Sequence, residues 1–293
     1  MLMFMPKQPL GEVFGFPIHN LSQAAQRYRQ NRLCPYNNKV PSCTKDKAND
    51  PLGVCSVYEG DDLAITCPIR FRQDWLIAED AAQFFFSETT KWTSLTEIRL
   101  NDKNGQSAGN IDVVIVAYDD QGRIIDFGAL EVQGVYISGN VRLPFEYYME
   151  NPAEHFNMDW NSPRNYPRPD YLSSSRKRLA PQLIYKGGIF KTWGKKIAVA
   201  LHKGFYSKLP EIPEVDREFA EMAWLVYDLQ YDEQSQIYRL TKYKTVYTLF
   251  QPALERLTIP EAGIIEEFVD YLQEKLDDRL DNPPDAPTLT DIL

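Results

Sequence analysis

The chain has 293 residues, enough for one or two domains and for a sizeable hydrophobic core. Hydrophobic residues make up 43%, charged residues 25% and aromatic residues 13%, which excludes an extended disordered chain. Its apolar runs, such as residues 113–117, are far shorter than the roughly 18 residues of a membrane span, and its first residues lack the pattern of a signal peptide. We therefore expect a folded, cytoplasmic protein.

The first predicted element is a helix over residues 22–33. Asn20 and Gln23 have the spacing of a capping pair directly before it. This helix leads into a segment that holds every cysteine of the chain.

The four cysteines are Cys34, Cys43, Cys55 and Cys67. A cytoplasmic chain keeps its thiols reduced, and four thiolates suit one tetrahedral zinc or iron ion. The residues between them are rich in Pro, Asn and Gly, so the segment needs a cross-link to fold. The spacings are not the C-x2-C pairs of common zinc sites. A structural, non-catalytic metal is the favoured interpretation, and four unrelated buried cysteines or disulfides are the alternatives.

Two helices and a hairpin are expected next. Residues 79–86 and 89–100 have helical patterns. Residues 111–118 form a β-branched run, residues 119–123 a turn, and residues 124–137 a second strand.

Four polar residues around this hairpin are candidates for catalysis: Glu97, Asp112, Glu131 and Gln133. Glu131 and Gln133 are two positions apart on one strand, so they project from the same face, and Asp112 can meet them from the partner strand. Carboxylates gathered in this way suit a hard divalent cation. The pattern is a variant of the PD-(D/E)xK metal site of many nucleases. The alternative is a solvated edge face, although the apolar surroundings of Glu131 indicate a central strand.

A basic segment follows at residues 164–208, which hold 11 Lys and Arg against one acid, Asp170, in a chain of net charge −9. Aromatic residues and glycines are interspersed with these cations, which favours binding to nucleic acid over a solvated lysine-rich face. The candidate DNA contacts are Arg176, Lys177, Arg178, Lys195 and Lys196.

The remaining predicted elements are strands and one long helix. We expect strands over residues 197–202, 223–231 and 236–247. A capping box that begins at Thr258 opens an amphipathic helix to about residue 280, with its apolar side facing inward, followed by a loose tail. The predicted class is mixed α/β with a central sheet flanked by helices and an N-terminal metal module.

Together, the cysteine set, Glu97, Asp112 and the tripeptide Glu131-Val132-Gln133 make the chain resemble the NotI-type restriction endonucleases. The resemblance implies a PD-(D/E)xK core and a homodimeric, Mg²⁺-dependent enzyme. It would cut double-stranded DNA at a GC-rich palindrome that contains CGGCCG. The host would also have a cognate DNA methyltransferase. It also implies that the four cysteines hold iron or zinc.

The resemblance implies residue roles as well. Asp112 and Glu131 would bind Mg²⁺, Glu97 would assist, and Gln133 would occupy the position of the usual lysine. We expect the metal module at residues 1–75 and the nuclease core at residues 76–293. The rival interpretations are a non-catalytic, metal-stapled DNA-binding protein and a carbohydrate-active enzyme that uses Asp112 and Glu131 as acid and base.

Overall fold

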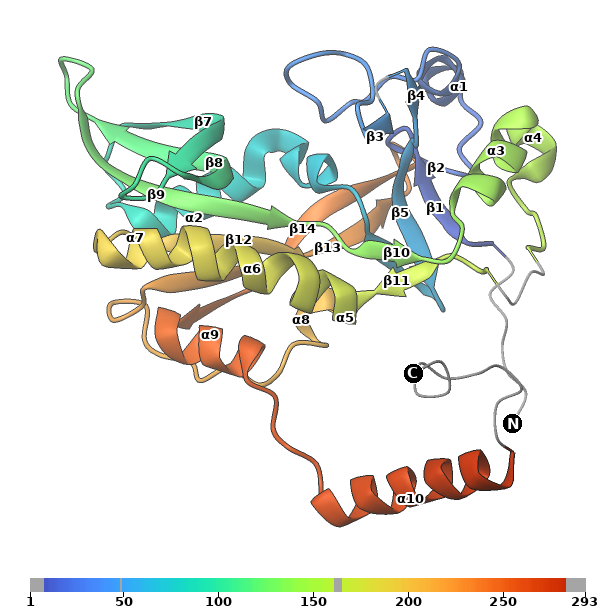
Figure 1. Cartoon of the computed structure of the whole chain (residues 1–293). Helices are drawn as coiled ribbons and strands as arrows, with labels where there is room; N and C mark the ends of the chain where they lie inside the picture. Colours follow the sequence, from blue (N-terminus) through green and yellow to red (C-terminus); the bar gives the residue numbers. More distant parts are fainter. Residues whose placement is uncertain (1–7, 48, 161–164, 283–293) are drawn as a thin grey trace. The chain divides into compact units, whose positions relative to one another are not determined.

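The computed structural model of the chain describes residues 8–47, 49–160 and 165–282 (Figure 1). The chain divides into two compact units, Met1–Thr258 and Ile259–Leu293. Across the described ranges, every helix is too short or too polar to cross a membrane.

The centre of the first unit is a six-stranded sheet with the order β14-β13-β12-β9-β8-β7. Strand β12 runs parallel to β9 and β13, and the other neighbouring pairs are antiparallel. The predicted mixed α/β class with a central sheet and flanking helices is thus confirmed. The strands are β7 (Trp92–Asn101), β8 (Ser107–Tyr118), β9 (Ile124–Gln133), β12 (Ile197–His202), β13 (Met222–Asp232) and β14 (Ile237–Thr248).

Both faces of this sheet are covered. Side chains alternate along β8, so Val113 packs with α2 (Leu76–Phe85) on one face and Val114 packs on the other. The second face is covered by a helical segment over residues 171–192 and by α9 (Phe250–Thr258). A polar side chain on either face of a central strand is therefore buried.

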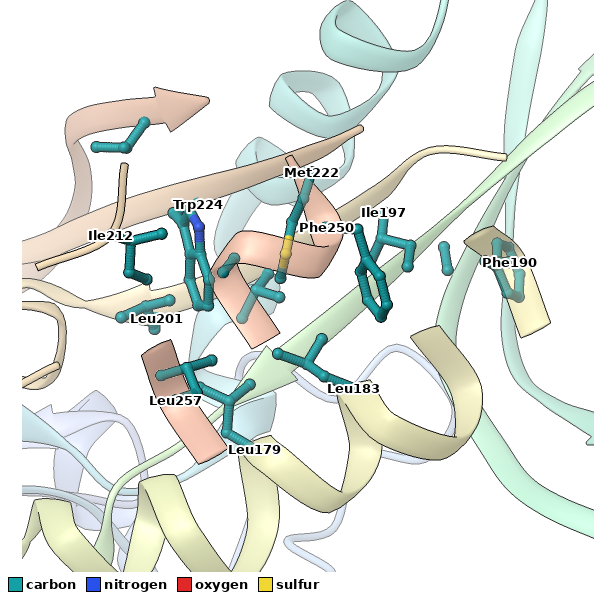
Figure 2. Close-up of a cluster of buried hydrophobic side chains, with 14 of the residues drawn as sticks. Leu179, Leu183, Phe190, Ile197, Leu201, Ile212, Met222, Trp224, Phe250 and Leu257 are labelled. Carbon is teal, nitrogen blue, oxygen red and sulfur yellow. The ribbon is translucent and has the colours of Figure 1, made fainter. Parts of the chain in front are cut away.

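The second face carries the largest hydrophobic cluster (Figure 2). Trp224 of β13 is fully buried there, and its indole nitrogen donates a hydrogen bond to the Thr248 hydroxyl at 3.2 Å. Leu183 of the helical segment and Leu257 of α9 lie in the same cluster. Each large apolar side chain buried in this way stabilises the fold by about 1.5–3 kcal/mol. The cluster fixes the helical segment against the sheet.

The helical segment contains two wide π-helical turns. Asp170 caps its start by accepting a hydrogen bond from the Ser173 amide at 2.9 Å. Pro181 lies between the two wide turns and has no backbone donor, which is a cause of irregular helical bonding. The segment runs through α5 (Tyr171–Ser174), η2 (Ser175–Leu179), α6 (Ala180–Gln182), η3 (Leu183–Gly187) and α7 (Gly188–Thr192).

The N-terminal residues form a separate four-stranded sheet with its own hydrophobic cluster. Phe145 and Tyr148 of helix α3 pack into that cluster. The elements outside the central sheet and the helices named above are β1 (Leu10–Val13), β2 (Phe16–Pro17), α1 (Gln23–Gln30), β3 (Asp46–Lys47), β4 (Asp50–Pro51), β5 (Val54–Glu59), β6 (Asp62–Ile65), η1 (Pro68–Trp75), β10 (Tyr136–Ser138), α3 (Arg142–Glu150), α4 (Pro152–His155), β11 (Arg168–Asp170) and α8 (Lys203–Tyr206).

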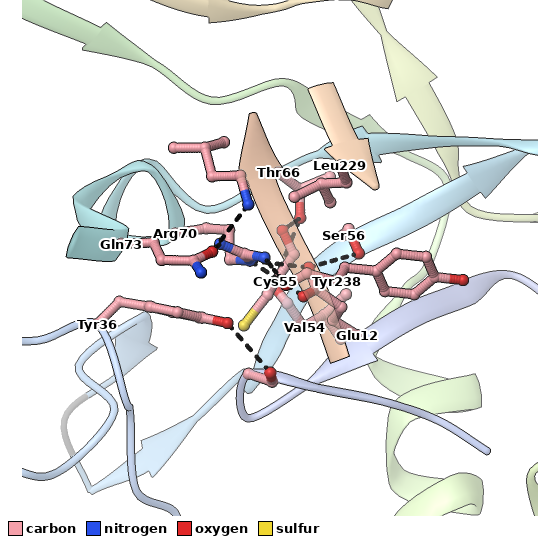
Figure 3. A network of polar contacts seen from close by, with 12 residues as sticks. Glu12, Tyr36, Val54, Cys55, Ser56, Thr66, Arg70, Gln73, Leu229 and Tyr238 are labelled. Carbon is pink, nitrogen blue, oxygen red and sulfur yellow. Dashed lines mark hydrogen bonds and ion pairs between the residues drawn. The ribbon is translucent and has the colours of Figure 1, made fainter. Parts of the chain in front are cut away.

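A buried polar network ties the N-terminal sheet to the central one (Figure 3). Arg70 of η1 and Glu12 of β1 are fully buried and form an ion pair at 3.0 Å. Arg70 also donates to the Gln73 side chain at 2.7 Å and to the backbone oxygen of Tyr238, on β14, at 2.7 Å. The Arg70 guanidinium lies 4.3 Å from the ring centre of Tyr36. One arginine therefore links three parts of the fold.

Several predicted elements are confirmed and others are wrong. The hairpin and the later strands are observed, although the strand that begins at residue 124 ends at Gln133 rather than at residue 137. The helix predicted over residues 89–100 is wrong, because the segment forms β7 with a largely alternating exposure typical of an edge strand. The first helix is confirmed, but Ser22 is its cap and not Asn20.

The C-terminal helix also differs from its prediction. Thr258 ends α9, and α10 (Ile265–Asp281) begins seven positions later, so the predicted capping box is not formed. None of the residues of α10 is buried within the unit to which it belongs, and the inward packing of its apolar side stays a prediction. Most of the predicted tail, residues 283–293, lies outside the described residues.

Candidate functional site

The hairpin of β8 and β9 directs two carboxylates to one face of the central sheet. Asp112 lies on the same side of β8 as Val114, and Glu131 on the same side of β9 as Ala129. This face is the one covered by the helical segment. Leu130 packs on the opposite face against α2.

The two carboxylates have unlike surroundings. The Oδ2 atom of Asp112 accepts a hydrogen bond from the Val132 amide at 2.8 Å. Glu131 is only 2% exposed, and its Oε2 lies 2.5 Å from the ammonium nitrogen of Lys186. The other oxygen, Oε1, is buried and has no hydrogen-bond partner among the described residues. A buried oxygen without a partner is costly, so this atom marks a place for a cation or a donor.

The electrostatics also indicate a shortage of positive charge at this site. Burial is the main cause that raises the pKa of Glu131, to about 8, and the neighbouring Asp112 charge raises it further. Lys186 acts in the opposite direction but does not cancel these effects. A second cation would stabilise the ionised form of Glu131.

Gln133 lies where β9 meets the N-terminal sheet. Its side chain is 5% exposed, and its amide nitrogen donates to the backbone oxygen of Gly134 at 2.8 Å. A side chain at Gly134 would come within 3.1 Å of the Thr66 backbone oxygen, so the two backbones pass closely here. This places the end of the hairpin against the segment that carries the cysteines.

Glu97 lies apart from the pair. Its neighbours Thr96 and Ile98 pair with Val113 and Ile111, so Glu97 stands opposite Asp112 in the register of β7 and β8. Its φ of 58° is unusual for a glutamate, and its side chain is 55% exposed and bonded to Lys39 at 2.8 Å. The Lys39 contact lowers the pKa of Glu97.

A cavity of about 1130 Å³ opens beside the carboxylates. Asp112 and Gln133 line it from the hairpin, Thr66 from the cysteine-bearing segment, and Lys177 and Arg178 from the helical segment. Its wall therefore combines acidic and basic side chains. Such a cavity can take an anionic group next to Asp112.

The cysteines form two neighbouring pairs of free thiols. A bridge between Leu33 and Ser42 brings Cys34 beside Cys43, and the Cys67 amide donates to the Cys55 backbone oxygen at 3.2 Å. The four are not bonded as disulfides.

Electrostatic interactions connect the two pairs. Burial is the main cause that raises the pKa of Cys34 to about 11, and the charges of Cys67 and Cys43 raise it further. Burial and the Cys67 charge also raise the pKa of Cys55. Across the described ranges, no three His, Cys, Asp or Glu side chains are grouped closely enough to hold a metal ion. The arrangement is thus four neighbouring thiols without a closed ligand set.

The sequence from residue 12 to residue 240 matches the family model described as restriction endonuclease NotI. The chain belongs to the NotI restriction endonuclease family. It is therefore a site-specific deoxyribonuclease of the type II restriction class, which acts on double-stranded DNA. A search of curated proteins finds no match. The family match includes all four cysteines, the hairpin and the basic segment.

The side chains predicted to contact DNA differ in their surroundings. Of the five predicted DNA contacts, Lys177 and Arg178 line the cavity, and Arg178 lies 5.1 Å from the ring centre of Tyr136. Arg176 belongs to the same wide turn, η2. Lys195 is already bonded to Asp126 at 2.6 Å, and Lys196 donates to the backbone oxygen of Phe84 at 3.3 Å.

Lys186 is the site residue that the sequence analysis missed. It is one of many lysines in the basic segment, and nothing in its sequence neighbourhood distinguishes it. Its contact with Glu131 joins residues 55 positions apart. Only the packing of the helical segment on the sheet reveals it.

Proposed function

We propose that this NotI-family enzyme is a homodimer that uses Mg²⁺ to hydrolyse DNA at a GC-rich palindromic site. The choice of the catalytic site in the protein rests on one observation. The Oε1 atom of Glu131 is buried and has no hydrogen-bond donor among the described residues, and the neighbouring Asp112 lines a cavity that cations also line. The GC-rich palindrome, a CGGCCG-containing site, the homodimer and a cognate methyltransferase rest on the family resemblance.

Asp112 and Glu131 would hold the Mg²⁺ ion, since carboxylate oxygens are the ligands that it prefers. When bound, Mg²⁺ would activate water and stabilise the negative charge that develops on the phosphate. The chain itself fixes the two carboxylates. Asp112 is held by the Val132 amide, and Glu131 by Lys186. This support comes from two different elements, so the ligands are positioned before DNA binds.

Gln133 and Glu97 would have secondary roles. Gln133 lines the cavity and would orient a water molecule or a phosphate oxygen through its amide. Glu97, which stands opposite Asp112 on β7, would assist a second ion after leaving Lys39. We propose these assignments as a PD-(D/E)xK core in which glutamine replaces lysine.

The four cysteines would hold one iron or zinc ion. The support is that four free thiols lie as two adjacent pairs with mutual electrostatic interactions. As thiolates they would repel one another, and a metal ion would remove that repulsion. We propose that residues 1–75 form this module and that residues 76–293 form the nuclease core.

The cations beside the cavity would contact the DNA backbone. Lys177 and Arg178 are the best placed, with Arg176 on the same turn. Lys195 and Lys196 would contribute less, because each already has a partner in the protein.

The test of this proposal is digestion of a GC-rich plasmid with Mg²⁺ or with EDTA, followed by sequencing of the fragment ends. We expect cleavage only with Mg²⁺, at one palindromic sequence, in both strands. Equal cleavage in EDTA, or fragment ends without a common sequence, would contradict it.

A further inference from the structure

Lys186 is a buried cation whose charge has no role in the proposal above beyond holding Glu131. It belongs to the wide turn η3, and its side chain is only 7% exposed. Besides Glu131 Oε2 at 2.5 Å, its ammonium donates to the backbone oxygen of Asn110 at 2.9 Å. Burying an ammonium is costly unless it is well paired. Both partners belong to the hairpin strands, so the lysine is directed at the carboxylate site.

The backbone around Lys186 is held close to the sheet. A side chain at the next residue, Gly187, would come within 2.6 Å of the ring of Phe250. Phe250 itself is buried in the large hydrophobic cluster. The turn that carries Lys186 is therefore tightly packed, and wide helical turns of this kind are frequent at functional sites.

The two carboxylate oxygens of Glu131 have different surroundings. Oε2 is bound by Lys186, whereas Oε1 is buried without a partner among the described residues. The charge of Asp112 acts on the same carboxyl group. Lys186 thus holds the carboxylate by one oxygen and leaves the other oxygen for a cation.

The charges at the site complete the argument. Asp112 and Glu131 can carry two negative charges, Gln133 carries none, and Lys186 carries one positive charge. In the usual nuclease motif the position of Gln133 is a lysine. We infer that Lys186 supplies this site's fixed positive charge from the helical segment and acts as the positioning residue for Glu131. This inference rests on the proposed function, because it assigns Mg²⁺ to Glu131.

A fixed ammonium next to the metal site has two opposing effects. It repels a divalent ion, but it also favours the ionised form of Glu131 by lowering its pKa, so its removal should change Mg²⁺ binding little. It also aligns Glu131 and offsets negative charge during the reaction, so its removal should slow cleavage. A substitution that only destabilised the fold would slow cleavage and would also weaken Mg²⁺ binding.

The test uses the full chain with Lys186→Met and Lys186→Arg. Mg²⁺ binding without DNA is measured by titration calorimetry, and kcat and KM for DNA are measured at saturating Mg²⁺. For Lys186→Met at saturating Mg²⁺ we expect kcat at least about tenfold lower with KM little changed, and Mg²⁺ binding within about threefold of the wild type. Lys186→Arg should recover part of kcat. An unchanged kcat, or Mg²⁺ binding as weak as in Glu131→Gln, would overturn the inference.

Lys242→Met is the matched control, because Lys242 also pairs with a buried carboxylate, Asp80, at 2.7 Å. It should change neither quantity. If Lys186→Met is too unstable to purify, Lys186→Met combined with Glu131→Gln should recover thermal stability, since both charges are removed together. A double variant as unstable as the single one would also overturn the inference.

Glu131→Gln separates this inference from the proposed function. If that variant still binds Mg²⁺ and cleaves DNA, the proposed function itself fails. If it loses both and Lys186→Met behaves like the wild type, only the role of Lys186 fails.

Discussion

At the scale of single residues, Glu131 is the most informative side chain. A carboxylate on a central strand with helices on both faces is expensive to bury. One oxygen has a lysine and the other has no partner within the described part of the chain. This imbalance supports the proposal that Glu131 binds a metal ion and does not only complete an ion pair with Lys186.

The raised pKa of Glu131 predicts a pH dependence of the metal-free enzyme. The folded state binds the proton of the Glu131 carboxyl group more tightly than the unfolded state does. Protonation of Glu131 therefore stabilises the fold fully below its ordinary pKa of 4.5, and this stabilisation is lost as the pH rises through about 8. In EDTA, the Tm should therefore fall more steeply over this range for the wild type than for Glu131→Gln. Saturating Mg²⁺ should flatten the wild-type curve. Parallel curves for the two proteins in EDTA would contradict this.

The sequence predicted the proposed metal ligands but not the side chains that hold them in place. The alternation of a strand suffices to place Glu131 and Gln133 on one face, and the β-branched run fixed the partner strand of Asp112. Lys186 could not be predicted, because its role depends on how a distant helix packs over the sheet. The contact of Glu97 with Lys39 is likewise tertiary.

At the scale of elements, the fold depends on how the N-terminal sheet is attached to the central sheet. The Arg70 network connects β1, η1 and β14, and the Val135 amide donates to Ile65 of β6 at 2.8 Å just after the hairpin ends. The cysteine-bearing segment also lines the cavity. Changes in the N-terminal sheet should therefore affect the proposed catalytic site.

Arg70→Met tests this attachment. Loss of a fully buried ion pair that leaves Glu12 unpaired should lower the free energy of unfolding by about 3–5 kcal/mol. The matched control is Arg32→Met, which breaks a half-exposed pair with Asp50 and should cost less than about 1 kcal/mol. Denaturant unfolding measures both. Equal losses would show that the buried network does not hold the sheets together.

Elemental analysis tests the metal module. We expect about one iron or zinc ion per purified chain, since four thiolates complete one tetrahedral site. Cys55→Ser should lower the metal content and the Tm, and a strong chelator should lower the Tm of the wild type. Ser42→Ala, an exposed change in the same segment, should do neither. A wild-type protein free of both metals that is insensitive to the chelator would refute the module.

Element prediction failed where tertiary structure overrides local pattern. Residues 89–100 have an apolar spacing compatible with a helix, yet pairing with β8 makes them a strand. The helical segment over residues 171–192 was not predicted, because its basic residues, Pro181 and adjacent glycines resemble a loop. Its packing in the large cluster stabilises it instead.

At the scale of the whole molecule, charge is unevenly distributed. The chain has a net charge of −9, but residues 164–208 are strongly basic. This segment contains the helical turns beside the cavity. Its field should guide DNA to the catalytic edge, while the acidic remainder limits non-specific binding.

Lys177→Gln combined with Arg178→Gln tests this distribution. Each lost phosphate contact should reduce the slope of log K against log salt by about 0.9, so the double variant should lose nearly 2 per subunit. The cleavage site should stay the same. Lys91→Gln, an exposed lysine outside the segment, should keep the wild-type slope. An unchanged slope in the double variant would contradict the assignment.

The central claim is that Asp112 and Glu131 hold the metal that cuts DNA. The most direct measurement compares Mg²⁺-dependent cleavage with DNA binding for purified Asp112→Ala and Glu131→Ala, with Asp120→Ala, in the exposed hairpin turn, as control. We predict that both site variants bind DNA but cleave it at least about a hundredfold more slowly, and that the control is fully active. Mg²⁺-dependent cleavage at the wild-type rate by either site variant would contradict the account.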